Sequence, residues 1–169
     1  MMFSTAFGRP SRRAKAYCGV PTSFVEGTRM PIPIVNGRRS LEIGTPGEMR
    51  QRLNALILRG EKRATAGLVH YYAAENEMIE TVGELLALVD DAMQPIASVA
   101  VVRVDVLAFA DVPFEFAQAE GEGDESIEGW RDGHRRFWTG EGEVIVDQTP
   151  VVLIWFQLVE DASSLRELS

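Results

Sequence analysis

Residues 59–68 read RGEKRATAGL, and the elements predicted on either side are arranged around this stretch. It follows a segment with the apolar spacing of an amphipathic helix and opens a run that alternates like a strand. Loops at such joins often carry functional side chains, because a rigid scaffold can aim them. A structural interpretation is equally simple: Gly60 ends the helix in the left-handed conformation, and Arg59, Lys62 and Arg63 complement the negative helix end.

The composition is that of an ordinary globular domain. The chain has 169 residues, of which 46% are hydrophobic and 25% charged, so one folded domain with its own core is expected. Cys18 is the single cysteine, which rules out a disulfide within the chain and favours a reducing, cytoplasmic location. The longest apolar run falls short of the ~20 residues that a membrane helix needs, so no membrane partner is expected.

Charge and metal-ligand types limit the partners further. The two histidines, His70 and His134, stand in no HxxH or HExxH pattern, so neither a metal nor another cofactor is expected. The formal net charge of −8 argues against tight non-specific binding to nucleic acid, and no DNA partner is expected. A local basic pocket is compatible with this charge, because net charge averages over the surface. The sequence gives no signal of an oligomeric state.

The chain divides into a basic start, one domain and a short end. Residues 1–30 contain arginines and a lysine but no acid before Glu26. They are predicted to be a disordered tail or the result of a start codon assigned too early, with Met30 as a later start. A composition like that of an organellar transit peptide is the alternative. The domain is predicted over 41–160, and a C-terminal tail over 161–169.

Periodicity and turn residues predict a mixture of helices and strands. Asn36-Gly37 is a turn signal, and the segment before it is an edge strand at best because prolines interrupt it. Three helices are predicted. The first runs from a cap at Thr45 to Gly60, the second follows Pro113, and the third runs from a cap at Asp124 to Gly140. The predicted strands are Ala64–Tyr72, Leu85–Val89, Ile96–Phe109, Glu143–Val146 and Val151–Val159.

Two segments in this order resemble the ASCH domain family. Residues 60–65 read GEKRAT and match its GxKxxT pattern. Residues 120–124 read EGEGD, and WR at 130–131, His134 and FW at 137–138 follow, which matches the second signature of bacterial single-domain members. The resemblance covers roughly 41–160. It implies an α+β, PUA-like fold, in which a small mixed β-barrel is flanked by helices and a cleft lies beside the first motif.

The resemblance also implies a substrate class. PUA-like relatives bind RNA or modified nucleobases, some small ASCH proteins are amidohydrolases that remove the acyl group from acylated cytidine, and another is assigned ribonuclease activity. The implied catalytic set is Lys62, Thr65 and a distant glutamate, for which Glu120 is chosen and Glu122 is the alternative. The smallest amidohydrolases lack the extended second signature. The expected partner is RNA or a modified nucleoside, which is either hydrolysed or only bound.

The hydrolytic hypothesis needs a particular bend in the chain. Lys62 and Thr65 are three residues apart and would point to opposite faces of a flat strand, so they converge only if the chain turns after Gly60. Desolvation would then lower the pKa of Lys62 and allow it to take the Thr65 hydroxyl proton. Thr65 would attack the amide carbonyl, and Glu120 would orient or relay the proton.

The binding hypothesis needs no chemistry. A charged Lys62, beside Gly60 and with Arg59 or Arg63, would hold a phosphate, while an aromatic side chain reads a base. The further candidate lining residues are Tyr71, Trp130 and His134.

Each of these residues also has a simpler interpretation. Trp130 and His134 share an apolar helical stripe and are then core residues. The acidic residues 122–125 are then a solvated loop that caps a helix, with a magnesium site as the minor alternative. A third functional class, a protein-interaction domain with a degenerate cleft, has no positive support in the sequence.

Overall fold

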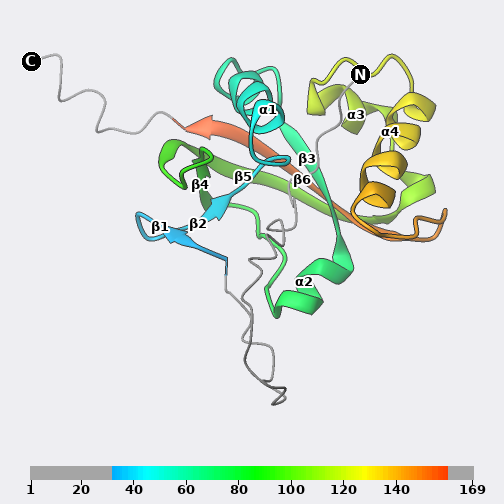
Figure 1. The fold of residues 1–169 in the computed structure, drawn as a ribbon, viewed down its shortest axis with the longest axis horizontal. Helices are drawn as coiled ribbons and strands as arrows, with labels where there is room; N and C mark the ends of the chain where they lie inside the picture. Colours follow the sequence, from blue (N-terminus) through cyan, green and yellow to red (C-terminus); the bar gives the residue numbers. More distant parts are fainter. Residues whose placement is uncertain (1–31, 160–169) are drawn as a thin grey trace, which may run out of the picture.

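The computed structural model of the protein describes residues 32–159 (Figure 1). The tails predicted at 1–30 and 161–169 lie outside the described residues. The strands are β1 (Ile34–Val35), β2 (Arg38–Leu41), β3 (Ala64–Leu68), β4 (Leu85–Val89), β5 (Pro95–Ala108) and β6 (Pro150–Val159). The helices are α1 (Glu48–Leu58), α2 (Val69–Glu75), α3 (Phe114–Glu120) and α4 (Ile127–Gly140), with a 3₁₀ turn η1 (Phe109–Asp111).

In this part of the chain the six strands form one mixed sheet in the order β1-β2-β4-β5-β6-β3. Only the β2–β4 pair is parallel, and the long strands β5 and β6 pair over most of their lengths. The predicted α+β class is confirmed. Closure into a barrel is not, because β1 and β3 are two separate edges. Amides just before and within the edge strand β3 donate to α3 instead of to another strand: Arg63 N donates to Ala119 O, and Ala66 N donates to the Glu120 carboxylate.

The first predicted helix ends as expected but begins later. Gly60 has φ +73°, and its amide donates to Ile57 O, which closes α1. The cap predicted at Thr45 is wrong, because α1 begins after Gly47, which has φ +105°. The Gly47 amide donates to the Asp91 carboxylate at 3.0 Å, so a distant side chain supplies the contact expected from a local cap.

Two of the predicted strands are wrong in part or in whole. The strand predicted over Ala64–Tyr72 stops at Leu68, and α2 follows. Leu68 pairs with Val151, the second residue of β6. Beyond Leu68 the chain therefore has no partner residues in β6, and α2 begins there. Residues 143–146 form no strand, since no neighbouring strand within 32–159 pairs with them, and Val144 is 84% exposed. The strands predicted at 85–89, 96–109 and 151–159 are confirmed.

The core consists of two apolar clusters. One includes α1 residues Leu53 and Ile57 and the β6 residues Ile154 and Phe156. The other includes residues of α3 and α4, with Phe116, Trp130 and Trp138 among its largest members, together with Ala64, Ala66 and Leu153 of the sheet. Figure 1 shows α3 and α4 together near β3 and β6. Residues 59–63 join α1 to β3, so the motif loop lies between the two clusters.

Candidate functional site

Lys62 lies in a buried cluster with two carboxylates, here named the Lys62 cluster and made of Lys62, Glu120 and Glu122. Its Nζ atom is 2.8 Å from Glu122 Oε1 and 3.6 Å from Glu120 Oε1. The side chains of Lys62 and Glu120 are 0% exposed, and that of Glu122 is 2% exposed. Arg52 Nη2 lies 3.4 Å from Glu122 Oε2, and its side chain is 38% exposed, so Arg52 connects the cluster with the surface.

Glu120 accepts hydrogen bonds from backbone and side chain. Its Oε1 accepts from Ala66 N at 3.1 Å, which satisfies an outward amide of the β3 edge. Its Oε2 accepts from Trp130 Nε1 at 2.5 Å. His134 Nε2 is 3.3 Å from the same Oε2 atom. Helices α3 and α4, strand β3 and the motif loop therefore meet at one buried carboxyl group.

His134 lies against the Glu120 carboxyl group. His134 stacks on Trp130 with the ring centroids 4.0 Å apart, and its Nδ1 is 3.1 Å from Trp130 O. Because a carbonyl oxygen can only accept, Nδ1 carries a hydrogen. Nε2 then faces Glu120 Oε2 favourably only when a proton resides on one of these two atoms.

Burial shifts the pKa values of the carboxyl groups in and beside the cluster upwards. Burial raises the pKa of Glu120 to about 7, although the charge of Lys62 and the bond from Trp130 act to lower it. Burial likewise raises the pKa of Glu122 and of Asp124. A carboxyl group that titrates near neutral pH can act as an acid or a base, and such shifts are frequent at functional sites.

The 121–126 loop covers the cluster and contains two glycines with positive φ, Gly121 at +67° and Gly123 at +94°. A Cβ atom on Gly121 would lie 2.3 Å from Glu61 O, so the loop crosses the motif backbone in close contact. The prediction that Glu122 is solvated is wrong, because Lys62 holds it inside. The cap predicted at Asp124 is also wrong, since Ser126 Oγ accepts from Gly129 N and starts α4.

Thr65 is close in sequence to Lys62 but is not hydrogen-bonded to the cluster. Its side chain is buried, and Oγ1 has no hydrogen-bond partner among the described residues. Ala64 and Ala66 belong to the core cluster of α3 and α4, and side chains alternate along β3, so Thr65 points to the opposite face. The structure thus brings Lys62 and Glu120 together without Thr65.

The other candidate residues separate into exposed and buried groups. Arg59 pairs with Glu61 at 2.7 Å on the surface, and Gly60 has open space around it. Tyr71 is buried on α2, with its ring against His70. Trp130 and His134 are core residues, as their helical stripe indicates, and they also contact Glu120. Within residues 32–159, no group of three or more His, Cys, Asp or Glu side chains is arranged to hold a metal ion.

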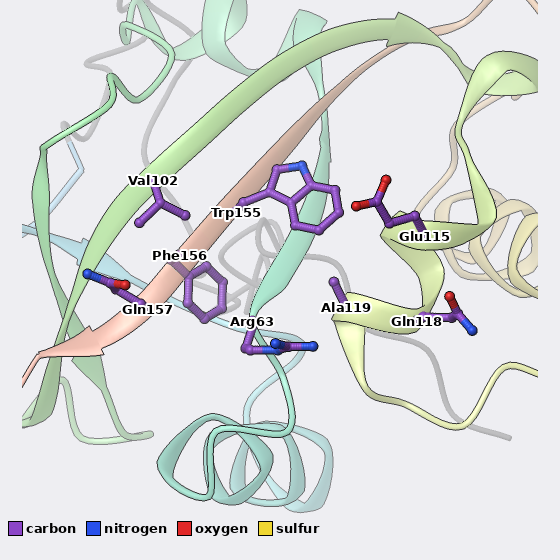
Figure 2. A pocket seen from close by; sticks show the side chains of 8 residues that line it. All are labelled: Arg63, Val102, Glu115, Gln118, Ala119, Trp155, Phe156 and Gln157. Carbon is purple, nitrogen blue, oxygen red and sulfur yellow. The ribbon is translucent and has the colours of Figure 1, made fainter.

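The resemblance implies a cleft beside the motif, and the groove that lies there is lined mostly by residues that were not predicted; it is here named the α3 groove. It has a volume of about 400 Å³. Figure 2 shows its lining side chains, which are Arg63, Val102, Glu115, Gln118, Ala119, Trp155, Phe156 and Gln157. They come from the motif loop, β5, α3 and β6. The sequence suggested only Arg63, because nothing local shows that Trp155 would lie next to the end of α3.

The fold and the cluster define a class of protein: a small α+β domain whose loop lysine, at the join of a helix and a strand, is held by buried carboxylates from a second loop. The ASCH domain family model matches residues 40–160, and the chain belongs to this family. No helix within residues 32–159 is long and apolar enough to cross a membrane.

Solved structures agree with this assignment. The crystal structure of an ASCH domain from Lactobacillus crispatus JV V101 is 32% identical, with a TM-score of 0.58, over 64% of this chain and 71% of that one. A protein from Enterococcus faecalis V583 is 26% identical, with a TM-score of 0.62, over 72% of this chain and 76% of that one. A comparison with curated proteins gave no match.

Proposed function

We propose that this ASCH domain binds a nucleobase, in RNA or in a modified nucleoside, at the Lys62 cluster. ASCH domains are PUA-like folds of an RNA-binding type, which supports the ligand class. The observation that carries the proposal is the buried ammonium of Lys62, which lies between Glu122 at 2.8 Å and Glu120 at 3.6 Å.

Burying the three ionisable groups of the Lys62 cluster in the core is unfavourable for the stability of the fold. Each group must lose its hydration, and a protein in which well-packed apolar residues replace a buried ion pair is often as stable as the original or more stable. A function explains why this chain keeps polar groups here. A lysine donor next to a carboxylate acceptor fits the edge of a cytosine-like base, because Lys62 can donate to a ring carbonyl and Glu120 can accept from an exocyclic amine.

Ligand entry requires a change in the 121–126 loop. The Glu122 carboxylate is paired with the Lys62 ammonium, so a carbonyl or anionic group of the ligand must displace the Glu122 carboxylate. Gly121 is packed against Glu61, whereas a Cβ atom added at Gly123 would meet nothing within 4 Å, so we place the start of the movement after Gly121. Arg52 already contacts Glu122 at 3.4 Å and can keep the displaced carboxylate paired nearer the surface.

The proposal is tested by calorimetric titration with cytidine monophosphate, an acylated cytidine and a short single-stranded RNA. Wild type is compared with Lys62→Met at pH 6 and low temperature, with circular dichroism to verify folding. We expect binding by wild type and at least a tenfold loss in Lys62→Met, which removes a charge-assisted donor worth about 1.5–3 kcal/mol. Arg136→Met, exposed on α4, is the control and should bind like wild type. Absence of binding by wild type, or equal binding by Lys62→Met, contradicts the proposal.

Hydrolysis of the amide in acylated cytidine is the second candidate function, and the pKa of Glu120 near 7 favours it. Thr65 Oγ1 would bond to the acyl carbon while its proton passes to Glu120. The carbon–nitrogen bond would then break as that proton moves to the exocyclic nitrogen, and water would release the acid from the Thr65 ester. Binding alone ranks first, because Thr65 Oγ1 forms no hydrogen bond with Lys62 or Glu120.

The same titration samples separate the two functions. If the domain is a hydrolase, chromatography shows cytidine and free acid accumulating with wild type, and Thr65→Val abolishes turnover while the protein stays folded. Intact acylated cytidine after incubation with a binding-competent wild type excludes hydrolysis of this substrate. Full turnover by Thr65→Val excludes the nucleophile role.

A further inference from the structure

We infer that the ligand is single-stranded RNA, and that the α3 groove holds the nucleotide next to the one bound at the Lys62 cluster. The inference rests on the proposed function and adds to it the polymeric state of the ligand, a second binding site and a base preference.

The two sites share one piece of backbone. Lys62 and Arg63 are consecutive, yet the Lys62 side chain is buried in the cluster whereas Arg63 is exposed and lines the groove. Arg63 N donates to Ala119 O at 2.7 Å, and Arg63 O accepts from Phe156 N at 2.9 Å. The backbone of Arg63 is therefore held between α3 and β6, which fixes the groove relative to the cluster.

The groove contains an aromatic surface of fixed orientation. Trp155 is partly exposed, its ring meets Phe116 edge-on at 5.4 Å, and the Arg103 guanidinium lies 5.1 Å from its centroid. These contacts hold the indole in place, and because the Arg103 guanidinium lies over one face of the ring, a base stacks on the opposite face. Stacking of a base on an aromatic ring contributes about 1–3 kcal/mol to binding of single strands. The volume of about 400 Å³ lies in the range of pockets that enclose small ligands, so one nucleotide fits.

The charged groups at the two ends of the groove determine how a nucleotide is oriented in it. Figure 2 shows Arg63 on one side of Ala119 and Glu115 on the other, with the Glu115 carboxylate turned towards Trp155. A phosphate is repelled by Glu115 and attracted by Arg63, so the backbone belongs at the Arg63 end. A base over Trp155 then presents its edge to Glu115, and Gln118 adds an amide to the lining. A carboxylate accepts from an exocyclic amine, so cytosine, adenine and guanine are favoured over uracil.

The negative net charge of the chain means that RNA binding depends on local contacts rather than on long-range attraction. With a formal charge of −8, the chain cannot attract RNA by its overall field. A single phosphate at Arg63 predicts a shallow salt dependence, with a slope of about −0.7 for log affinity against log salt concentration. That slope should approach zero when Arg63 is neutralised.

The experiment compares cytidine monophosphate with hexanucleotides of cytidine and uridine, using wild type, Arg63→Gln and Glu115→Gln. We expect wild type to bind the cytidine hexamer at least tenfold more tightly than the monophosphate. Arg63→Gln should weaken hexamer binding about five- to tenfold and leave the monophosphate unaffected, because only the groove contact is lost. Glu115→Gln should reduce the preference for the cytidine hexamer over the uridine hexamer without abolishing it, because Glu120 in the Lys62 cluster still accepts from the exocyclic amine of the base bound there. Arg136→Gln is the control.

The outcomes distinguish the two proposals. If the monophosphate binds but the hexamer binds no more tightly, or if Arg63→Gln weakens both ligands equally, the groove inference is wrong while the proposed function stands. If neither ligand binds wild type, the proposed function fails and the groove inference fails with it.

Discussion

Replacing Lys62 with methionine should lower the free energy of unfolding by about 3–5 kcal/mol at pH 7.5. Methionine fills much of the same volume but carries no charge. Glu120 and Glu122, with side chains 0% and 2% exposed, then lose their shared counter-charge in the core. The measurement is denaturant unfolding followed by circular dichroism, and the loss should appear as a lower midpoint.

The loss should shrink in acid. Burial raises the pKa of Glu120 to about 7 even though Lys62 lowers it, so without Lys62 the pKa rises further. A carboxyl group whose pKa is higher in the folded state binds its proton on folding, so its charging destabilises the fold as pH rises from its unfolded value through the folded one. Protonation at pH 5 therefore relieves the buried charge, and Lys62→Met should approach wild type there.

Arg59→Met is the matched control for stability. Arg59 is three residues away in the same loop, but its ion pair with Glu61 is on the surface, with side chains 55% and 51% exposed. Exposed pairs contribute little, so no measurable change is expected. An unfolding midpoint for Lys62→Met equal to that of wild type at pH 7.5 contradicts a charged, buried cluster.

Gly121→Ala should destabilise the fold by about 3–4 kcal/mol, since two costs add. A residue with a Cβ atom at φ +67° is strained by about 1–2 kcal/mol. The new Cβ would also lie 2.3 Å from Glu61 O and 2.7 Å from Glu61 C, and backbone cannot move aside as a flexible side chain can. Overpacking of this kind costs roughly 1–3 kcal/mol. Thermal and denaturant unfolding both report it.

Gly123→Ala separates the clash from the strain. Gly123 lies in the same loop with φ +94°, and an added Cβ would meet nothing within 4 Å. It should therefore show the conformational cost alone, about 1–2 kcal/mol. Equal effects of the two substitutions would mean that the 121–126 loop does not press against the motif backbone.

Local patterns predicted those elements whose signals lie in neighbouring residues. Gly60 ended α1 as expected, and the apolar run of residues 151–159 formed the inner strand β6. The errors arose where distant residues override local preference. Val69 and the tyrosines after it favour a strand, yet the end of β6 leaves them without a partner. Asp91, far along the chain, replaced Thr45 at the start of α1.

The residues of the site likewise differ in how far the sequence predicted them. The paired motifs linked Lys62 with Glu120, because the resemblance carries information about contacts that spacing alone does not. Glu122 was missed as a buried group, since a Gly-rich acidic stretch has the composition of a solvated loop. Its burial depends on Gly121 crossing the motif at contact distance, which only the folded chain shows. Trp155 lies in the strand predicted at residues 151–159, and its position in a groove depends on where α3 ends.

The most direct measurement is a titration that follows the three indole N–H signals by nuclear magnetic resonance. Trp130 Nε1 donates to Glu120 Oε2 in the cluster, Trp155 lines the α3 groove, and Trp138 is fully buried in the core. Single phenylalanine substitutions assign the signals. Cytidine monophosphate should shift the Trp130 signal and leave Trp155 unchanged, while Trp138 responds least. Saturating binding with no shift of the Trp130 signal would contradict recognition at the Lys62 cluster.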